Sequence, residues 1–405
     1  MFIAGREINM SYKTKAVVLG NNYYIGLSAI RSLGIHGVPV VAMDYSDKDT
    51  YGAKSKYVSE KYIVPHYRDE KEAFIEALID FAKKEDNKPV LIPCHDSYVE
   101  VIDEYLDILI NYYLIPQQSQ GIYTQAMNKD TLHNLALEHR VKVPEIIQTD
   151  EENFYDRVEK ELGFPCLVKP VDSPTFVDYF RKKLFIVENR SELKDAIEKS
   201  TKAQLDVFAQ RIIPGFDDHM HTYDAYVNQE GVVTHWTTAQ KFRQYPINFG
   251  ASVYTVQKAF PELHEIGAPF LENMGFKGFA EIEFKKDENT GDFYLIEINV
   301  RITNFNEMLR KVGLNFPYIT YKELIGEPLE AKAIDYTTNI AFRYLFEDLL
   351  AIKDYIKSKQ LGLFSILKTL LKRKAGAIWS WRDPLPGFSF TFMMIKKFFN
   401  RLFKR

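Results

Sequence analysis

The chain has 405 residues, a length that suits two or three packed modules of ~150 residues each. With 46% hydrophobic, 14% aromatic and 26% charged residues, the composition excludes disorder or low complexity over the whole sequence. No apolar run reaches the ~18 residues of a membrane span. Two cysteines, Cys94 and Cys166, cannot build a disulfide scaffold, and the first twelve residues lack the pattern of a secretory signal. These features predict a cytoplasmic location.

The net charge of −3 conceals two regions of opposite charge. From Leu361 onward the sequence has ten Lys and Arg residues and one acid, Asp383, which gives a net charge of +9. The first 360 residues carry 42 bases and 54 acids, a net charge of −12. The basic tail is therefore expected to have a role separate from that of the acidic body.

Strands and helices alternate over residues 14–125. Short apolar runs at 16–19, 38–42 and 90–92 are typical of buried parallel strands, and helical spacing follows each run, at 25–33, 71–84 and 98–110. The alternation predicts a doubly wound parallel sheet. Between Gly20 and Gly26 the turn carries bulky residues, so a tight strand-to-helix turn is favoured over a dinucleotide site. A hydride-transfer enzyme remains a minor alternative.

An α+β pattern follows over residues 126–330. It predicts helices at 131–139, 153–162 and 192–199, strands at 166–169, 184–187 and 207–213, and two hairpins, 223–227 with 232–238 and 278–284 with 293–298. Residues 331–405 are expected to form a helical extension that ends in a basic amphipathic tail. The predicted fold is therefore α/β followed by α+β, in three regions.

The most informative motif is Glu281-Ile-Glu-Phe followed, after a turn, by Leu295-Ile-Glu-Ile-Asn-Val-Arg301. The period of two in adjacent strands would bring Glu283, Glu297 and Asn299 to one face, with Arg301 beside them. Carboxylate and amide oxygens suit Mg²⁺. The alternative is an exposed strand face decorated with charge. The flanking apolar residues indicate a buried setting, so we favour the metal site.

Four bases form a second set. Lys169 ends an apolar strand, Lys129 opens a helix, and Lys241 and Arg243 follow the strand that ends near Thr238. Lysine point charges and a planar arginine suit a triphosphate. Each base alone is better explained as a solvated surface charge, so its weight comes from the joint pattern with the acids.

Two further segments carry polar groups at strand ends. The strand 207–213 stops at Pro-Gly and is followed by Asp217-Asp218, so its backbone could meet an adenine edge and an acid could meet ribose hydroxyls. An edge-strand turn is the default interpretation. Cys94-His95-Asp96 follows the strand 90–92, where a substrate contact is one interpretation and a helix cap by Asp96 is the favoured one.

In this order and spacing, the three sets resemble the ATP-grasp superfamily of carboxylate–amine ligases over residues 15–326. The most specific element is Glu297-Ile-Asn-Val-Arg301. Residues 171–183 depart from the superfamily, because a glycine-rich phosphate flap is common there. That departure is similar to the bacterial D-aspartate ligase branch, as are residues 240–246 and 383–386.

The resemblance implies a role for each candidate residue. Lys129 and Lys169 would bind the nucleotide phosphates, Gln210, Arg211 and Ile213 would form the hinge over adenine, and Asp217 or Asp218 would bind the ribose. Glu283, Glu297 and Asn299 would be the magnesium ligands. The catalytic residues would be the positively charged side chains of Arg301, Lys169, Lys241 and Arg243.

The implied activity is an ATP-dependent ligation. A carboxylate, expected to be an amino acid, would be joined to an amine through an acyl-phosphate, with a cell-wall precursor as one candidate acceptor. The cofactors would be ATP and two Mg²⁺, with Mn²⁺ able to substitute. A catalytically silent ATP-binding protein of the same fold is the alternative. No nucleic-acid partner is expected. The tail is expected either to bind an anionic membrane surface at the inner face of the cell membrane or to pack on the body.

Overall fold

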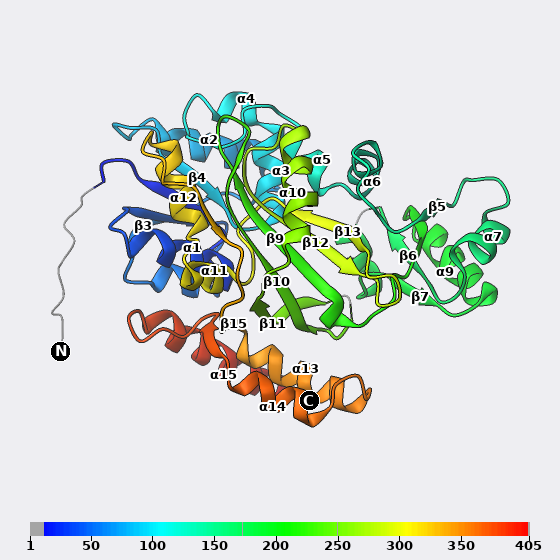
Figure 1. The fold of residues 1–405 in the computed structure, drawn as a ribbon. Coiled ribbons are helices and arrows are strands. Elements are labelled where there is room, and N and C mark those ends of the chain that lie inside the picture. The colour runs from blue at the N-terminus through cyan, green and yellow to red at the C-terminus, as the bar shows by residue number, and fades with distance from the viewer. Residues whose placement is uncertain (1–11, 172, 249, 404–405) are drawn as a thin grey trace.

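The computed structural model describes residues 12–171, 173–248 and 250–403. The segment assessed above for a secretory signal lies almost wholly outside these residues, as do the last two bases of the tail. Within the described ranges, no helix combines the length and the hydropathy that crossing a bilayer requires. Three sheets, called sheets A, B and C below, organise the chain (Figure 1).

Sheet A contains four parallel strands in the order β3-β2-β1-β4. The strands are β1 (Ala16–Leu19), β2 (Val40–Asp44), β3 (Val58–Ile63) and β4 (Val90–Pro93), and the helices are α1 (Tyr24–Gly34), α2 (Lys71–Ala82), α3 (Asp96–Glu104) and α4 (Leu106–Leu109). Along β1, Ala16 and Val18 enter one hydrophobic cluster and Val17 and Leu19 another, so both faces are covered. This confirms the predicted doubly wound parallel sheet.

The turn between β1 and α1 is built for close packing. A Cβ on Gly26 would lie 2.0 Å from the carbonyl oxygen of Gly20. The backbone N–H groups of Asn21 and Asn22 donate to the Asp44 carboxylate at 2.8 and 3.0 Å. Donors that a dinucleotide site would offer to phosphate are thus used within the protein, in agreement with the tight turn favoured from the sequence.

Sheet B is a four-stranded antiparallel sheet in the order β5-β8-β6-β7, in the lobe on the right of Figure 1. Its strands are β5 (Ile146–Gln148), β6 (Cys166–Pro170), β7 (Phe185–Val187) and β8 (Val207–Arg211). The helices around it are α5 (Ile122–Met127), α6 (Lys129–Glu138), α7 (Phe154–Arg157), a π-helical turn (Val158–Leu162), α8 (Ser173–Phe180) and α9 (Arg190–Lys202). Helix α8 was not predicted, and it occupies the segment where a glycine-rich flap is common.

Sheet C runs in the order β13-β12-β9-β10-β11-β15-β16, with β14 beside β10. Its strands are β9 (Met220–Val227), β10 (Val233–Tyr245), β11 (Ala251–Gln257), β12 (Gly278–Lys286), β13 (Phe293–Asn299), β14 (Lys332–Ile334), β15 (Ile340–Arg343) and β16 (Arg373–Gly376). Helices α10 (Pro261–Asn273), α11 (Asn306–Val312) and α12 (Phe316–Leu324) accompany it. Both predicted hairpins are present, as β9–β10 and β12–β13.

The C-terminal extension was predicted to be helical, and this prediction is wrong in part. Strands β14, β15 and β16 fall within it and complete sheet C, and its helices are α13 (Leu345–Lys357) and α14 (Leu363–Leu370), between β15 and β16, and α15 (Leu385–Phe403), after β16. The three helices lie along the lower side of the molecule in Figure 1. Asp383 anchors the start of α15 to the body, since it accepts hydrogen bonds from Arg31 Nε (2.9 Å), Ser55 Oγ (2.7 Å) and the Lys56 N–H (2.9 Å).

Candidate active site

A cavity of about 840 Å³ opens among the three sheets. It is lined from β6 and β8 of sheet B, from β10, β12 and β13 of sheet C, and from the segment that follows β4 of sheet A. The predicted site residues that line it are Lys129, Lys169, Gln210, Arg211, Ile213, Asp217, Lys241, Glu283, Glu297, Asn299 and Arg301. Side chains separated by up to 172 positions in the sequence therefore share one cavity.

The acidic face of the cavity follows from the register of β12 and β13. Glu283 lies opposite Glu297 and Glu281 lies opposite Asn299 in this antiparallel pair. The Asn299 amide donates to Glu283 Oε1 at 3.3 Å, and Arg301 Nη2 donates to Asn299 Oδ1 at 3.2 Å. The structure thus brings together the three oxygen donors and the guanidinium that the period of two suggested.

Glu281 belongs to the same face and was not singled out from the sequence. Its side chain is 2% exposed and its Oε1 accepts no hydrogen bond from the described residues; the nearest cation is Lys241 Nζ at 3.6 Å. The signal was present, because Glu281 and Glu283 are two positions apart in one strand and must share a face. A buried carboxylate oxygen without a hydrogen bond is costly and favours a cation beside it.

Lys241 of β10 lies over this acidic face. Its ammonium pairs with Glu283 and also approaches Glu281. Burial lowers the pKa of Lys241, but the charges of Glu283 and Glu281 outweigh that effect and leave the pKa raised. Burial raises the pKa of Glu283 to about 8; Lys241 opposes the shift and Glu297 adds to it. The positive charge of Lys241 is thus not enough to offset the effect of burial on the pKa of Glu283.

Lys169 and Lys129 lie on the opposite wall, from sheet B and α6. Asn128 caps α6, since its Oδ1 accepts the N–H groups of Asp130 and Thr131 at 3.0 and 3.1 Å, and this sets Lys129 at the first position of the helix. Burial lowers the pKa of Lys169 to about 8, with a further decrease from Lys129 and an opposing effect of Glu297. Two ammonium groups close together, one of them desolvated, favour an anionic ligand.

Glu297 responds to the same charges in the opposite direction. Burial raises the pKa of Glu297, but Lys241, Lys183, Lys129 and Lys169 together lower it more, and the net shift is downward. Lys183, which also lines the cavity, comes from the segment that departs from the superfamily and was not predicted as a site residue. Glu297 is therefore ionised over the neutral range.

The oxygen donors fit a magnesium ion that is completed by phosphate. Over the described residues, no three His, Cys, Asp or Glu side chains converge closely enough to hold a metal by themselves. Mg²⁺ is usually bound through one or two carboxylates, with phosphate and water oxygens filling the remaining positions. Glu283 and Glu297 with the amide oxygen of Asn299 supply such a partial set, and the Glu281 oxygen without a hydrogen bond lies on the same face.

The proposed adenine hinge is positioned by β8. Gln210, Arg211 and Ile213 all line the cavity where this strand ends. The backbone N–H of Arg211 donates to the Glu145 carbonyl oxygen at 2.9 Å, and its guanidinium pairs with the Glu145 carboxylate at 3.2 Å. The N–H of Arg211 is therefore used within the protein.

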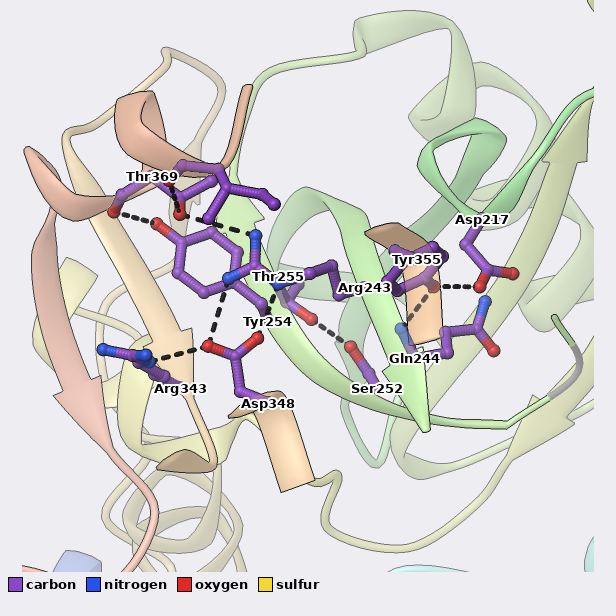
Figure 2. A network of polar contacts seen from close by, with 11 residues as sticks. Asp217, Arg243, Gln244, Ser252, Tyr254, Thr255, Arg343, Asp348, Tyr355 and Thr369 are labelled. Carbon is purple, nitrogen blue, oxygen red and sulfur yellow. Dashed lines mark hydrogen bonds and ion pairs between the residues drawn. The ribbon is translucent and has the colours of Figure 1, made fainter. Parts of the chain in front are cut away.

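The two aspartates that the resemblance connects with ribose lie in different places relative to the cavity. Asp217 lines the cavity and is buried, and its Oδ2 accepts hydrogen bonds from the Tyr355 hydroxyl and from the Asn248 N–H at 2.8 Å (Figure 2). Asp218 does not line the cavity, because its carboxylate turns to His219 at 3.0 Å. Of the pair, Asp217 is therefore the one that lines the cavity. Tyr355 comes from α13, which no motif connected with the site.

Arg243 does not lie at the site, so its predicted catalytic role is wrong. Its guanidinium is buried against Asp348 of α13, with Nε donating to Oδ1 at 2.5 Å and Nη2 to Oδ2 at 3.1 Å, and it lies 4.2 Å from the Tyr254 ring centre (Figure 2). The reason is a bulge: the register of β10 against β11 shifts on both sides of Arg243. The shift breaks the alternation that would have put Lys241 and Arg243 on one face.

The segment after β4 contributes to the cavity and to Arg301. His95, not Asp96, is the cap of α3, since its Nδ1 accepts the Ser97 N–H at 3.3 Å. Asp96 is the first helical residue, and its Oδ1 pairs with Arg301 Nε at 2.7 Å. Both His95 and Asp96 line the cavity. The favoured capping interpretation therefore assigned the cap to the wrong residue of the pair.

Comparisons with known proteins agree with this geometry. Residues 138–325 match the family model for the D-ala D-ala ligase C-terminus. D-aspartate ligase from Enterococcus faecium (strain Aus0004) is 26% identical over 281 residues, which are 66% of this chain and 66% of that protein. D-alanine–D-alanine ligase from Pelagibacter ubique (strain HTCC1062) is 22% identical over 234 residues, 53% of this chain and 73% of that protein.

Solved structures share the fold. N5-carboxyaminoimidazole synthetase from Staphylococcus aureus has a TM-score of 0.62 at 18% identity and covers 80% of each chain. The biotin carboxylase domain of Hydrogenobacter thermophilus 2-oxoglutarate carboxylase, solved with MgADP, ADP and bicarbonate, has a TM-score of 0.63 at 17% identity, over 82% of this chain and 74% of that one. The resemblance read from the sequence is therefore confirmed: the chain is similar in sequence to these ligases and shares the ATP-grasp fold of these solved structures.

Proposed function

We propose that this protein is an ATP- and Mg²⁺-dependent ligase that joins the carboxylate of an amino acid to an amine. The observation that carries the proposal is the opposition of Glu281, Glu283 and Glu297 to Lys129 and Lys169 across one cavity. In a polyphosphate bound with a metal ion, the ion would neutralise the carboxylates of one wall while the phosphate oxygens pair with the lysines of the other. The MgADP bound by the structurally similar biotin carboxylase domain supports the choice of nucleotide.

The residues have separable tasks in this proposal. Lys129 and Lys169 bind the phosphates, the backbone at Ile213 meets the adenine edge, and Asp217 takes the ribose hydroxyls. Glu283, Glu297 and Asn299 would hold two Mg²⁺ ions, or Mn²⁺ in their place, which neutralise phosphate charge when bound. Arg301, held by Asp96, offers its guanidinium to the charge that develops on the transferring group. Lys241 holds the carboxylates of Glu281 and Glu283 in place through its ammonium group.

The chemistry needs no side-chain nucleophile. A carboxylate oxygen attacks the γ-phosphorus, the bond to the β-phosphate oxygen breaks, and ADP leaves. The amine nitrogen then attacks the acyl carbon, loses a proton, and expels inorganic phosphate together with one oxygen of the original carboxylate. Catalysis by the protein consists of positioning and charge neutralisation. Cys94 and Cys166 are buried and belong to hydrophobic clusters, in keeping with this.

An amino acid is the proposed carboxylate because the two sequence relatives described above are named for amino acids. The test is ADP release from ATP and Mg²⁺ with a panel of D- and L-amino acids as carboxylates. Each is combined with amines that include a cell-wall precursor peptide. Release that depends on both a carboxylate and an amine supports the proposal. ATP binding without any such release would instead favour a catalytically silent nucleotide-binding protein.

A further inference from the structure

Helix α15 has two apolar faces, and one of them is turned inward. Phe390 and Met393 pack against the hydrophobic cluster that contains Tyr51 and Tyr344, with the rings of Phe390 and Tyr51 5.4 Å apart. Lys397 pairs with Asp49 at 2.7 Å, and the buried Arg31–Asp383 pair fixes the start of the helix. These contacts set the rotation of α15 on the body, so its other face must point to solvent.

The second face of α15 is a stripe of large apolar side chains at helical spacing. Its exposed members are Leu385, Phe388, Phe392, Ile395 and Phe399. Their spacing of three and four residues keeps them on one side of the helix. Phe392 is 70% exposed, so most of its side chain is in contact with solvent. We call this face the outer stripe.

Two tryptophans and a second helix extend the apolar surface. Trp379 meets Phe388 edge to face with ring centres 5.2 Å apart, and Trp381 is 99% exposed. On α14, Phe364 and Leu367 are exposed at the same helical spacing. Exposed aromatic surface of this extent marks an interaction site rather than an ordinary protein surface.

The exposed charges of the described tail itself have one sign. Over the described residues from Leu361 onward, the exposed charged side chains are all bases, and they include Lys368, Arg373, Arg382, Lys396 and Lys397. The one acid of this region, Asp383, is 1% exposed and turned inward to Arg31. The described tail thus offers no exposed acid of its own, and among its exposed bases Lys397 is the one that pairs with an acid of the body, Asp49.

We propose that the outer stripe of α15, with Trp379, Trp381 and α14, docks on the surface of an anionic lipid bilayer. Large apolar groups would enter the boundary between headgroups and acyl chains, while Arg382 and Lys396 meet anionic headgroups. Tryptophan suits this boundary because it has a large apolar ring system and one polar N–H. Lys368 lies 4.7 Å from the ring centre of Phe364, which shows the same pairing of base and aromatic ring on α14.

A second copy of the chain fits this surface less well. A two-fold interface would place the same patch on both partners, and the bases of one copy would then face those of the other. No acidic side chain within the patch is available to compensate that repulsion, because Asp383 is committed to Arg31. The charge therefore favours anionic lipid over self-association.

Docking is separable from catalysis. No residue of the described extension beyond 361 lines the cavity, so changes to the outer stripe leave the ligase residues in place. The experiment is flotation of the full-length protein with vesicles of phosphatidylcholine containing phosphatidylglycerol, compared with vesicles of phosphatidylcholine alone. The protein should float with the anionic vesicles only, and added salt should release it.

Two variants test the two parts of the surface. Phe388→Ser with Phe392→Ser should abolish flotation, whereas Ile63→Ser, at an exposed apolar residue of β3, should not. Arg382→Glu with Lys396→Glu should weaken the partition by at least about 25-fold, on the basis of about fivefold for each base near an anionic surface. The matched reversal of Lys83 and Lys199, which are exposed elsewhere, should change it little.

The proposal is wrong if the wild-type protein ignores anionic vesicles, or if both double variants float as it does. Sedimentation of the lipid-free protein provides the alternative outcome. A dimer that Phe388→Ser with Phe392→Ser converts to a monomer, without any vesicle binding, would assign the surface to a second copy. Unchanged ADP release by the variants without vesicles shows that they are folded.

Discussion

The hydroxyl of Tyr355 on α13 donates a hydrogen bond to the carboxylate of Asp217, at the wall of the cavity (Figure 2). The same hydroxyl accepts the Gln244 N–H at 3.0 Å, so α13 is linked to both β10 and the cavity. Burial raises the pKa of Asp217, and the bonds from Tyr355 and Asn248 offset part of that rise. The C-terminal extension therefore positions a residue that we assign to the nucleotide.

Removing this hydroxyl should weaken nucleotide binding with little effect on the chemical step. In Tyr355→Phe, Asp217 keeps only the Asn248 N–H and gains freedom to turn away from the ribose. We expect KM for ATP to rise about tenfold, in line with ~1.5 kcal/mol for a hydrogen bond to a charged group, while kcat stays within about twofold. Steady-state kinetics measure both. Tyr179→Phe, on the exposed surface of α8, is the matched control.

The buried pair of Arg243 and Asp348 should contribute to stability rather than to catalysis. Asp348 also accepts from Arg343 Nε at 2.7 Å, so Asp348→Ala leaves two guanidinium groups without their partner. Breaking a buried pair costs about 3–5 kcal/mol of unfolding free energy. Urea denaturation should show that loss. Asp195→Ala, which breaks an exposed pair with Lys199, should cost at most about 1 kcal/mol. A loss for Asp348→Ala as small as for Asp195→Ala would contradict the assignment.

Lys169 should make nucleotide affinity depend on pH. Its pKa in the free protein is lowered to about 8 by burial and by Lys129. A bound triphosphate favours the charged ammonium and raises that pKa, so affinity is full below pH 8 and falls as the pH rises above it. Calorimetric titration across this range should show the decline. Lys169→Arg should flatten it, because arginine stays charged.

The loss of the Lys169 side chain should also be large in magnitude. Lys169→Ala should weaken ATP binding by about 1.5–3 kcal/mol, the usual contribution of a charge-assisted contact. Lys199→Ala, at an exposed lysine, should leave binding unchanged. If the two changes had equal effects on ATP affinity, Lys169 would be an ordinary surface charge and not a nucleotide contact.

Glu297→Gln tests the acidic face with an isosteric change. We expect amine-dependent ADP release to fall by about 10² to 10³, as for removal of one charge-stabilising group. The free energy of unfolding should change little, because Glu297 is exposed at the cavity and the amide has nearly the same shape as the carboxylate. Wild-type turnover in this variant would contradict the assignment of Glu297 as a magnesium ligand.

The sequence predicted the parts of the site that depend on local periodicity. Glu283, Glu297 and Asn299 share a face because the pairing of β12 with β13 is regular from Glu281 to Glu283, before its register shifts at Phe284, and alternation in two strands is readable without the structure. Lys129 and Lys169 were found for a similar reason, since each lies at the end of a regular element. The parallel pairing in sheet A followed from alternating apolar runs and helical spacing.

What the sequence did not reveal depends on irregular backbone or distant contacts. The bulge beside Arg243 reverses its face, and no composition signal marks a bulge. Tyr355 reaches Asp217 from 138 positions away. Strand β3 was missed because it carries Ser59, Glu60 and Lys61 at a sheet edge, where apolar alternation is not required.

The transfer of oxygen from the carboxylate to phosphate tests the proposed ligation most directly. An amino acid that supports ADP release is labelled with ¹⁸O in its carboxylate and incubated with ATP, Mg²⁺ and the amine. An acyl-phosphate intermediate requires that each inorganic phosphate formed carries one oxygen from that carboxylate. The account predicts labelled phosphate in amounts equal to the amide formed. Unlabelled phosphate, released while the amide forms, would contradict it.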